Sequence, residues 1–156
     1  MIKYVIAVII VFLLGVGTYN VVAQPNARFP FFSGQEVPSP GDWLTDKNIA
    51  ISGRNVLLSI PNATLVAYAN TNSMDPVLDD TAHGIEIPPL KEKLRVGDII
   101  SYRSSTLNVI VVHRIVSIEQ DSRGAYYTVQ GDNNNAKDPE KVRFEDIEGV
   151  VVALIY

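Results

Sequence analysis

The longest apolar run of the chain lies near its N-terminus, from Ile2 to Val22, and Lys3 is the only charged residue within it. A helix needs about 20 apolar residues to cross a bilayer, and this run reaches that length. We therefore predict a single-pass transmembrane anchor over residues 1–23, with Lys3 and the N-terminus in the cytoplasm. The alternative is a cleaved signal peptide ending at Val21-Val22-Ala23. Both interpretations export the rest of the chain.

After the anchor, the pattern of residues changes twice. Residues 24–42 are rich in Pro, Gly and Ser, and proline interrupts helices and strand ladders, so this segment is expected to be a linker. In residues 43–156, short runs of Val, Ile and Tyr alternate with turn residues, a pattern typical of strands. The expected strands are Asn55–Ile60, Leu65–Ala69, Asp98–Tyr102, Asn108–Ile118, Tyr126–Gln130 and Val150–Ile155. We predict a mainly β domain, built as a coiled sheet or a partly closed barrel.

Composition excludes several classes of function. The net charge is −4 and no basic stripe is present, which argues against nucleic acid as a partner. The chain contains no cysteine, so thiol catalysis, disulfides and thiolate metal sites are excluded. The two histidines form no zinc-binding pattern and no glycine-rich nucleotide loop occurs, so neither a metal nor another cofactor is expected.

A candidate nucleophile lies in the segment T-N-S-M-D-P, where Ser73 follows the apolar run Leu65–Ala69. Pro76 prevents that strand from continuing, so Ser73 is expected at an exposed turn with free backbone N–H groups. A nucleophilic serine benefits from such a position because its own amide can bind an oxyanion. By composition alone, an ordinary polar turn is the commoner explanation of these residues.

A candidate base and two candidate acids follow later in the chain. His113 lies in the apolar segment V-I-V-V-H-R-I-V, so a buried strand must supply partners for both the histidine and Arg114. The polar segment G-D-N-N-N-A-K-D contains Asp132 and Asp138, either of which could fix the histidine tautomer. A lone core histidine and a solvated turn are the simpler interpretations of each segment taken separately.

Four segments in the same order resemble the motifs of type I signal peptidases. N-S-M-D-P-V-L is similar to the nucleophile motif S-M-x-P, and G-D-I-I-S-Y at residues 97–102 resembles the start of a family strand. V-V-H-R-I-V resembles the strand that carries the base, and G-D-N-N-N-A-K-D resembles the final acidic motif. The resemblance spans Ser73 to Asp138, and the predicted anchor precedes it.

This resemblance implies a role for each candidate residue. Bacterial members use lysine as the base, so His113 indicates the archaeal and endoplasmic-reticulum branch. Ser73 would then be the nucleophile and His113 the general base. Asp138 would orient the histidine, with Asp132 as a second supporting acid. Thr71 and the Ser73 amide would bind the oxyanion.

The implied function is removal of signal peptides from exported preproteins by an extracytoplasmic, membrane-anchored serine endopeptidase. Preprotein signal peptides and the lipid bilayer would be its partners, with the secretion translocon as a further candidate. The chain departs from the family at Asn72, which stands where glycine is frequent, and at Gly84–Lys93, which we interpret as an extra loop. The spacing between the anchor and Ser73 is also much longer than family members usually have.

Two alternatives remain open from the sequence. The first is a non-catalytic, membrane-anchored β domain that binds a peptide or a partner protein. The second is a self-cleaving repressor-type relative, which shares the serine turn. That class uses a lysine base and carries a DNA-binding segment, and this chain has neither feature.

Overall fold

The computed structural model describes residues 37–156, which form one compact unit. The predicted anchor and residues 24–36 of the predicted linker lie outside the described residues. None of the helices within residues 37–156 is long and apolar enough to cross a membrane.

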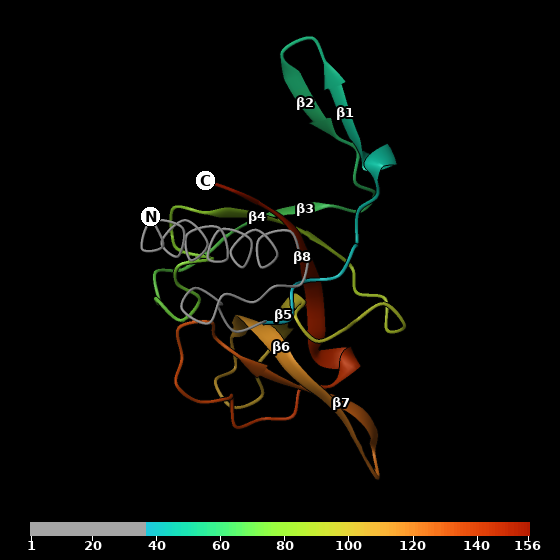
Figure 1. Cartoon of the computed structure of the whole chain (residues 1–156). Coiled ribbons are helices and arrows are strands. Elements are labelled where there is room, and N and C mark those ends of the chain that lie inside the picture. The colour runs from blue at the N-terminus through green and yellow to red at the C-terminus, as the bar shows by residue number, and fades with distance from the viewer. Residues whose placement is uncertain (1–36) are drawn as a thin grey trace, which may run out of the picture. The chain divides into compact units, whose positions relative to one another are not determined.

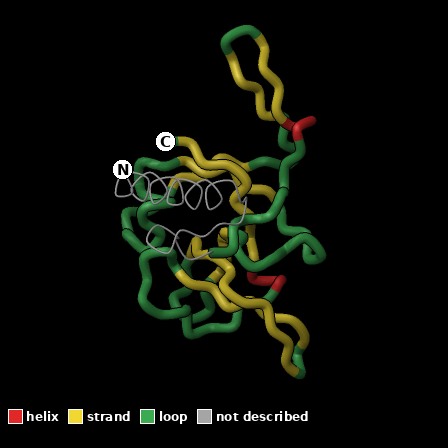
Figure 2. Tube along the Cα trace, viewed as in Figure 1, coloured by secondary structure: helices red, strands yellow, loops and turns green. Residues whose placement is uncertain are grey.

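The described chain is mainly β, as predicted (Figure 1). Almost all of its regular structure is strand, and the only helices in residues 37–156 are two single 3₁₀ turns (Figure 2). In chain order the elements are η1 (Asp46–Asn48), β1 (Ile49–Ser52), β2 (Asn55–Leu58), β3 (Thr64–Ala67), β4 (His83–Ile87), β5 (Ile99–Arg103), β6 (Ile110–Asp121), β7 (Gly124–Gln130), η2 (Phe144–Asp146) and β8 (Ile147–Ile155). Each of the six expected strands overlaps an observed one.

The strands form two antiparallel sheets, namely the hairpin β1–β2 and a six-stranded sheet ordered β3-β4-β8-β5-β6-β7. The interpretation of Gly84–Lys93 as a loop is wrong for its first residues. Residues 84–87 belong to β4, which pairs with β3 on one side and β8 on the other. Two partner strands satisfy the backbone groups that a loop would leave to solvent.

Strand β6 changes partners along its length. Residues 110–114 pair with β5, and pairing with β7 begins only at Arg114, with an irregularity between Ile115 and Ser117. From Ile110 to His113, therefore, none of the described strands pairs with the second edge of β6. Such an edge presents free backbone N–H and C=O groups.

Apolar clusters cover both faces of the six-stranded sheet, because adjacent residues on a strand point to opposite sides. Ile100 and Val150 belong to the larger cluster, whereas their neighbours Ile99 and Val151 belong to the smaller one. The larger cluster comprises Trp43, Leu94, Ile100, Tyr102, Ile115, Tyr127, Val129, Val142, Ile147 and Val150. The smaller cluster also contains Met74 and Leu78, which lie beside Ser73 in the sequence, so it anchors the serine turn to the sheet.

Two polar features complete the frame. The fully buried Asp98 accepts hydrogen bonds from the Gly41 amide at 2.6 Å and the Trp43 indole at 3.1 Å, so the end of the predicted linker is fixed to the sheet.

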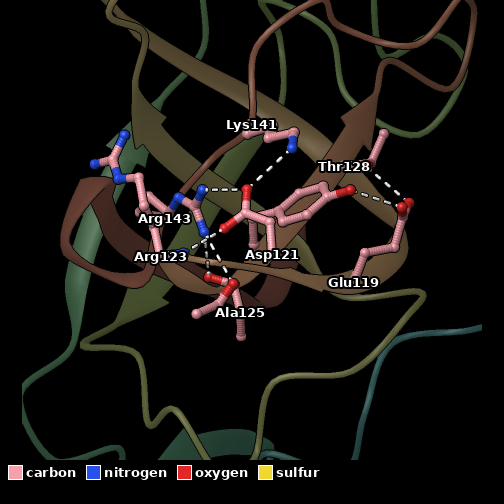
Figure 3. A network of polar contacts seen from close by, with 9 residues as sticks. Glu119, Asp121, Arg123, Ala125, Thr128, Lys141 and Arg143 are labelled. Carbon is pink, nitrogen blue, oxygen red and sulfur yellow. Dashed lines mark hydrogen bonds and ion pairs between the residues drawn. The ribbon is translucent and has the colours of Figure 1, made fainter.

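Around the β6–β7 hairpin, the Asp121 carboxylate contacts Arg143 at 2.7 Å and Lys141 at 3.0 Å (Figure 3). Hydrogen bonds from these cations hold the pKa of Asp121 well below its usual range, and Arg143 has the larger effect.

Candidate active site

The Ser73 turn follows β3, and apolar residues next to Ser73 pack against the sheet. Met74, the residue after Ser73, is buried in the smaller apolar cluster. Asn72 has a φ of 56°, a left-handed conformation that asparagine adopts more readily than most other residues. Asn72 therefore suits this turn without the need for a glycine. The Ser73 hydroxyl lies 3.1 Å from the Thr71 hydroxyl, within hydrogen-bond distance.

His113 lies on β6 opposite Ile100, and its ring contacts the loop after β7. Its Nδ1 atom lies 2.6 Å from Oδ2 of Asp138, and the two side chains are 8% and 14% exposed. The Asp138 amide in turn donates to the Val129 carbonyl at 2.9 Å. A carboxylate at Nδ1 favours the tautomer with its proton on that nitrogen. The other ring nitrogen, Nε2, is then free to accept a proton.

Tyr102 is a third member of this group, and none of the sequence motifs pointed to its role. Its hydroxyl donates to Oδ2 of Asp138 at 2.5 Å, which is the same oxygen that His113 contacts. Burial, and then the bond to Asp138, raise the pKa of Tyr102, so the phenol remains a donor. The alternation of side chains along a strand, with a period of two residues, could have indicated its position. Cross-strand partners share a face, as do residues two apart, so Tyr102 and His113 lie on one face.

Asp132 contacts Arg114 instead of His113. Its two carboxylate oxygens accept from Nε and Nη2 of Arg114 at 2.7 Å and 2.6 Å. Nη1 of the same guanidinium donates to the Gly97 carbonyl at 2.7 Å. In residues 37–156 no hydrogen bond joins Asp132 to His113. Arg114 therefore ties the acidic loop and the start of the G-D-I-I-S-Y segment to β6.

The acidic loop is also bonded to the serine turn. The Asn133 amide donates to the Ser73 carbonyl at 3.0 Å, and its side chain donates to the Asn72 carbonyl at 2.9 Å. Gly131 lies at the junction. A methyl group on it would collide with the Ser73 carbonyl oxygen and would lie only 2.9 Å from Nε2 of His113. The absent side chain thus lets the nucleophile turn and the base approach each other.

A cavity of about 320 Å³ opens at this junction. Ser73, His113 and Thr71 contribute to its wall, and the remainder is mainly apolar: Tyr68, Ala69, Met74, Leu78, Leu107, Val109, Ile110, Val111 and Val112. Among the described residues, no hydrogen bond joins the Ser73 hydroxyl to His113. Catalytic hydrogen bonds are often long without substrate and form in the complex. The arrangement contains the parts that acyl transfer requires, with the serine hydroxyl turned towards Thr71.

In residues 37–156, no group of three or more His, Asp or Glu residues is arranged to hold a metal ion. A comparison with models of known protein families gives no match, and a comparison with curated protein sequences gives none either.

Proposed function

We propose that this chain is a membrane-anchored serine endopeptidase of the signal peptidase type, with Ser73 as the nucleophile and His113 as the general base. The observation that supports the proposal most is the shared cavity, in which the serine turn meets a histidine held by Asp138. The four motifs of the sequence lie in one region. Hydrogen bonds join three of them through Gly97, Arg114 and Asp132, and the bond from the Asn133 amide to the Ser73 carbonyl adds the nucleophile motif.

The reaction begins when the Ser73 side chain rotates from Thr71 towards His113. The Ser73 oxygen attacks the scissile carbonyl carbon while its proton passes to Nε2 of His113. The Ser73 amide and the Thr71 hydroxyl stabilise the negative oxygen of the intermediate. The proton then moves to the leaving amine as the peptide bond breaks. Water, deprotonated by His113, hydrolyses the acyl-enzyme and restores the serine.

An extended peptide fits the surroundings of the nucleophile. The unpaired edge of β6 between Ile110 and His113 borders the cavity and can hydrogen-bond a substrate backbone. Alternate substrate side chains would then point into the mainly apolar cavity. Its modest volume is suited to the small residues that signal peptidases accept next to the cleavage site.

The proposed setting is the outer surface of the cell membrane. The predicted anchor would hold the domain where the cleavage sites of preproteins emerge, which raises their effective concentration. Preprotein signal peptides are the proposed substrates, and the bilayer and secretion translocon are the proposed neighbours.

The test uses the purified full-length chain in liposomes with a preprotein substrate. Ser73→Ala should abolish cleavage, whereas Ser122→Ala, at the exposed tip of the β6–β7 hairpin, should leave it unchanged. Both variants should melt at the same temperature as the parent chain. Undiminished turnover by Ser73→Ala would end the proposal.

A second candidate function is peptide binding without cleavage. The contact between the Ser73 and Thr71 hydroxyls favours it, because the serine is not bonded to the histidine. A parent chain that binds signal peptides but never cleaves them, even at high enzyme concentration, would establish this alternative.

A further inference from the structure

The hairpin β1–β2 is separate from the six-stranded sheet, and Figure 1 shows it standing apart from the other strands of the described domain. It lies between residue 23, where the predicted anchor ends, and Ser73. It therefore occupies the extra length by which this chain departs from the signal peptidases it resembles.

Both faces of this hairpin are apolar. Ile51 pairs with Val56 on one face, and Ala50 pairs with Leu57 on the other. Ile51 is 79% exposed, and Val56 and Leu57 are also largely exposed. A two-stranded ribbon with bare apolar faces is marginal in water. The acyl boundary of a bilayer can take up apolar side chains from both faces.

The charge around the hairpin also differs from that of the whole chain. No Asp or Glu occurs between Lys47 and Met74, although acidic residues outnumber basic ones in the chain. Lys47 and Arg54 are the only charged residues in this range, and Arg54 is in the hairpin turn. The β6–β7 hairpin provides the contrast, because it carries Asp121 in its ion-pair network.

We propose that the β1–β2 hairpin is a membrane-contact element that lies in the headgroup region of an anionic bilayer. Its apolar side chains reach the acyl boundary, while Lys47 and Arg54 extend to lipid phosphates. With the predicted anchor, the hairpin gives the domain a second attachment and restricts how it tilts over the bilayer. This role does not depend on the chemistry at Ser73.

The absence of cysteine allows a direct test. Two variants of the full-length chain, Ile51→Cys and Ser122→Cys, are each labelled with an environment-sensitive fluorophore on their single cysteine. Each is reconstituted in phosphatidylcholine vesicles with or without about one third phosphatidylglycerol. Quenching by lipids that carry a nitroxide near the headgroup reports contact with the bilayer.

Quenching of the label at position 51 should be about three times as strong as quenching of the label at position 122, or stronger. The emission of the label at position 51 should also shift to the blue. Arg54→Gln should lower the ratio of inserted to free hairpin about fivefold in anionic vesicles, whereas Arg123→Gln in the other hairpin should not. Equal quenching of both labels would overturn the proposal. A blue shift at position 51 that grows with protein concentration, without lipid quenching, would instead assign the hairpin to contact with a second copy. Either result leaves the Ser73→Ala experiment unaffected.

Discussion

Removing the Tyr102 hydroxyl is the sharpest test of the hydrogen-bond network behind His113. Tyr102 is 1% exposed, and its hydroxyl donates to the Asp138 oxygen that also contacts Nδ1 of His113. Tyr102→Phe keeps the ring that packs in the larger apolar cluster and removes only this donor. Asp138 would then rely on His113 alone at that oxygen.

The expected cost follows from the kind of bond that is lost. A hydrogen bond to a charged group contributes roughly 1.5–3 kcal/mol to stability. In a domain of about 100 residues, each kcal/mol shifts Tm by roughly 4–8 °C. Turnover should fall by about tenfold, because a freer carboxylate holds the imidazole less firmly, and misplacement by about 1 Å can cost 10²-fold.

Tyr127→Phe is the matched control, since Tyr127 is also buried in the larger cluster and its hydroxyl makes no hydrogen bond among the described residues. Thermal melting and single-turnover cleavage are measured for both variants. If Tyr102→Phe loses no more stability and activity than Tyr127→Phe, the network does not position His113.

Three further predictions use other contacts. Asp138→Asn should cut single-turnover rates about 10³-fold or more and lower Tm about as much as Tyr102→Phe, because the same bond loses its charged acceptor. Asp132→Asn should chiefly lower Tm, and a large loss of rate in Asp132→Asn but not in Asp138→Asn would exchange their roles. Gly131→Ala should cost about 1–3 kcal/mol in urea melts and about 10²-fold in turnover, because the added methyl group pushes against His113. Burial raises the pKa of Glu86 above its ordinary 4.5, so the folded state binds this proton more tightly than the unfolded state does. The folded state therefore loses stability as pH rises from the ordinary pKa to the raised one. Glu86→Gln should remove this loss when Tm is compared between mildly acidic and neutral pH.

The strands that the sequence predicts are those with a strong local pattern. β6 and β8 carry long runs of Val and Ile, which suit a pleated and buried surface. β4 begins with His83 and Gly84, which weakens its local signal. β1 is as short as the predicted strands β2 and β3, and its pairing with β2 makes it a strand. Pairing with β3 and β8 makes β4 a strand, and that information lies far away in the chain.

The same limit applies to the candidate site. Sequence order indicates a serine after a strand, a histidine within one and two acids in a loop. It does not indicate whether Asp132 or Asp138 contacts His113, because that depends on the path of the loop after β7. The bond from Tyr102 to Asp138 and the pair of Arg114 with Asp132 both depend on strand register. The anchor and the catalytic roles stay predictions.

The position of β8 has a consequence for biosynthesis. This strand follows all the others in the sequence, yet it lies in the middle of the six-stranded sheet, between β4 and β5. During synthesis, β3–β4 and β5–β6–β7 are made as two separate pieces that share no strand pairing. The domain can close only when residues 147–155 have been added, and such late, long-range pairing is slow. A nascent chain therefore cannot assemble this fold before its last strand has been made.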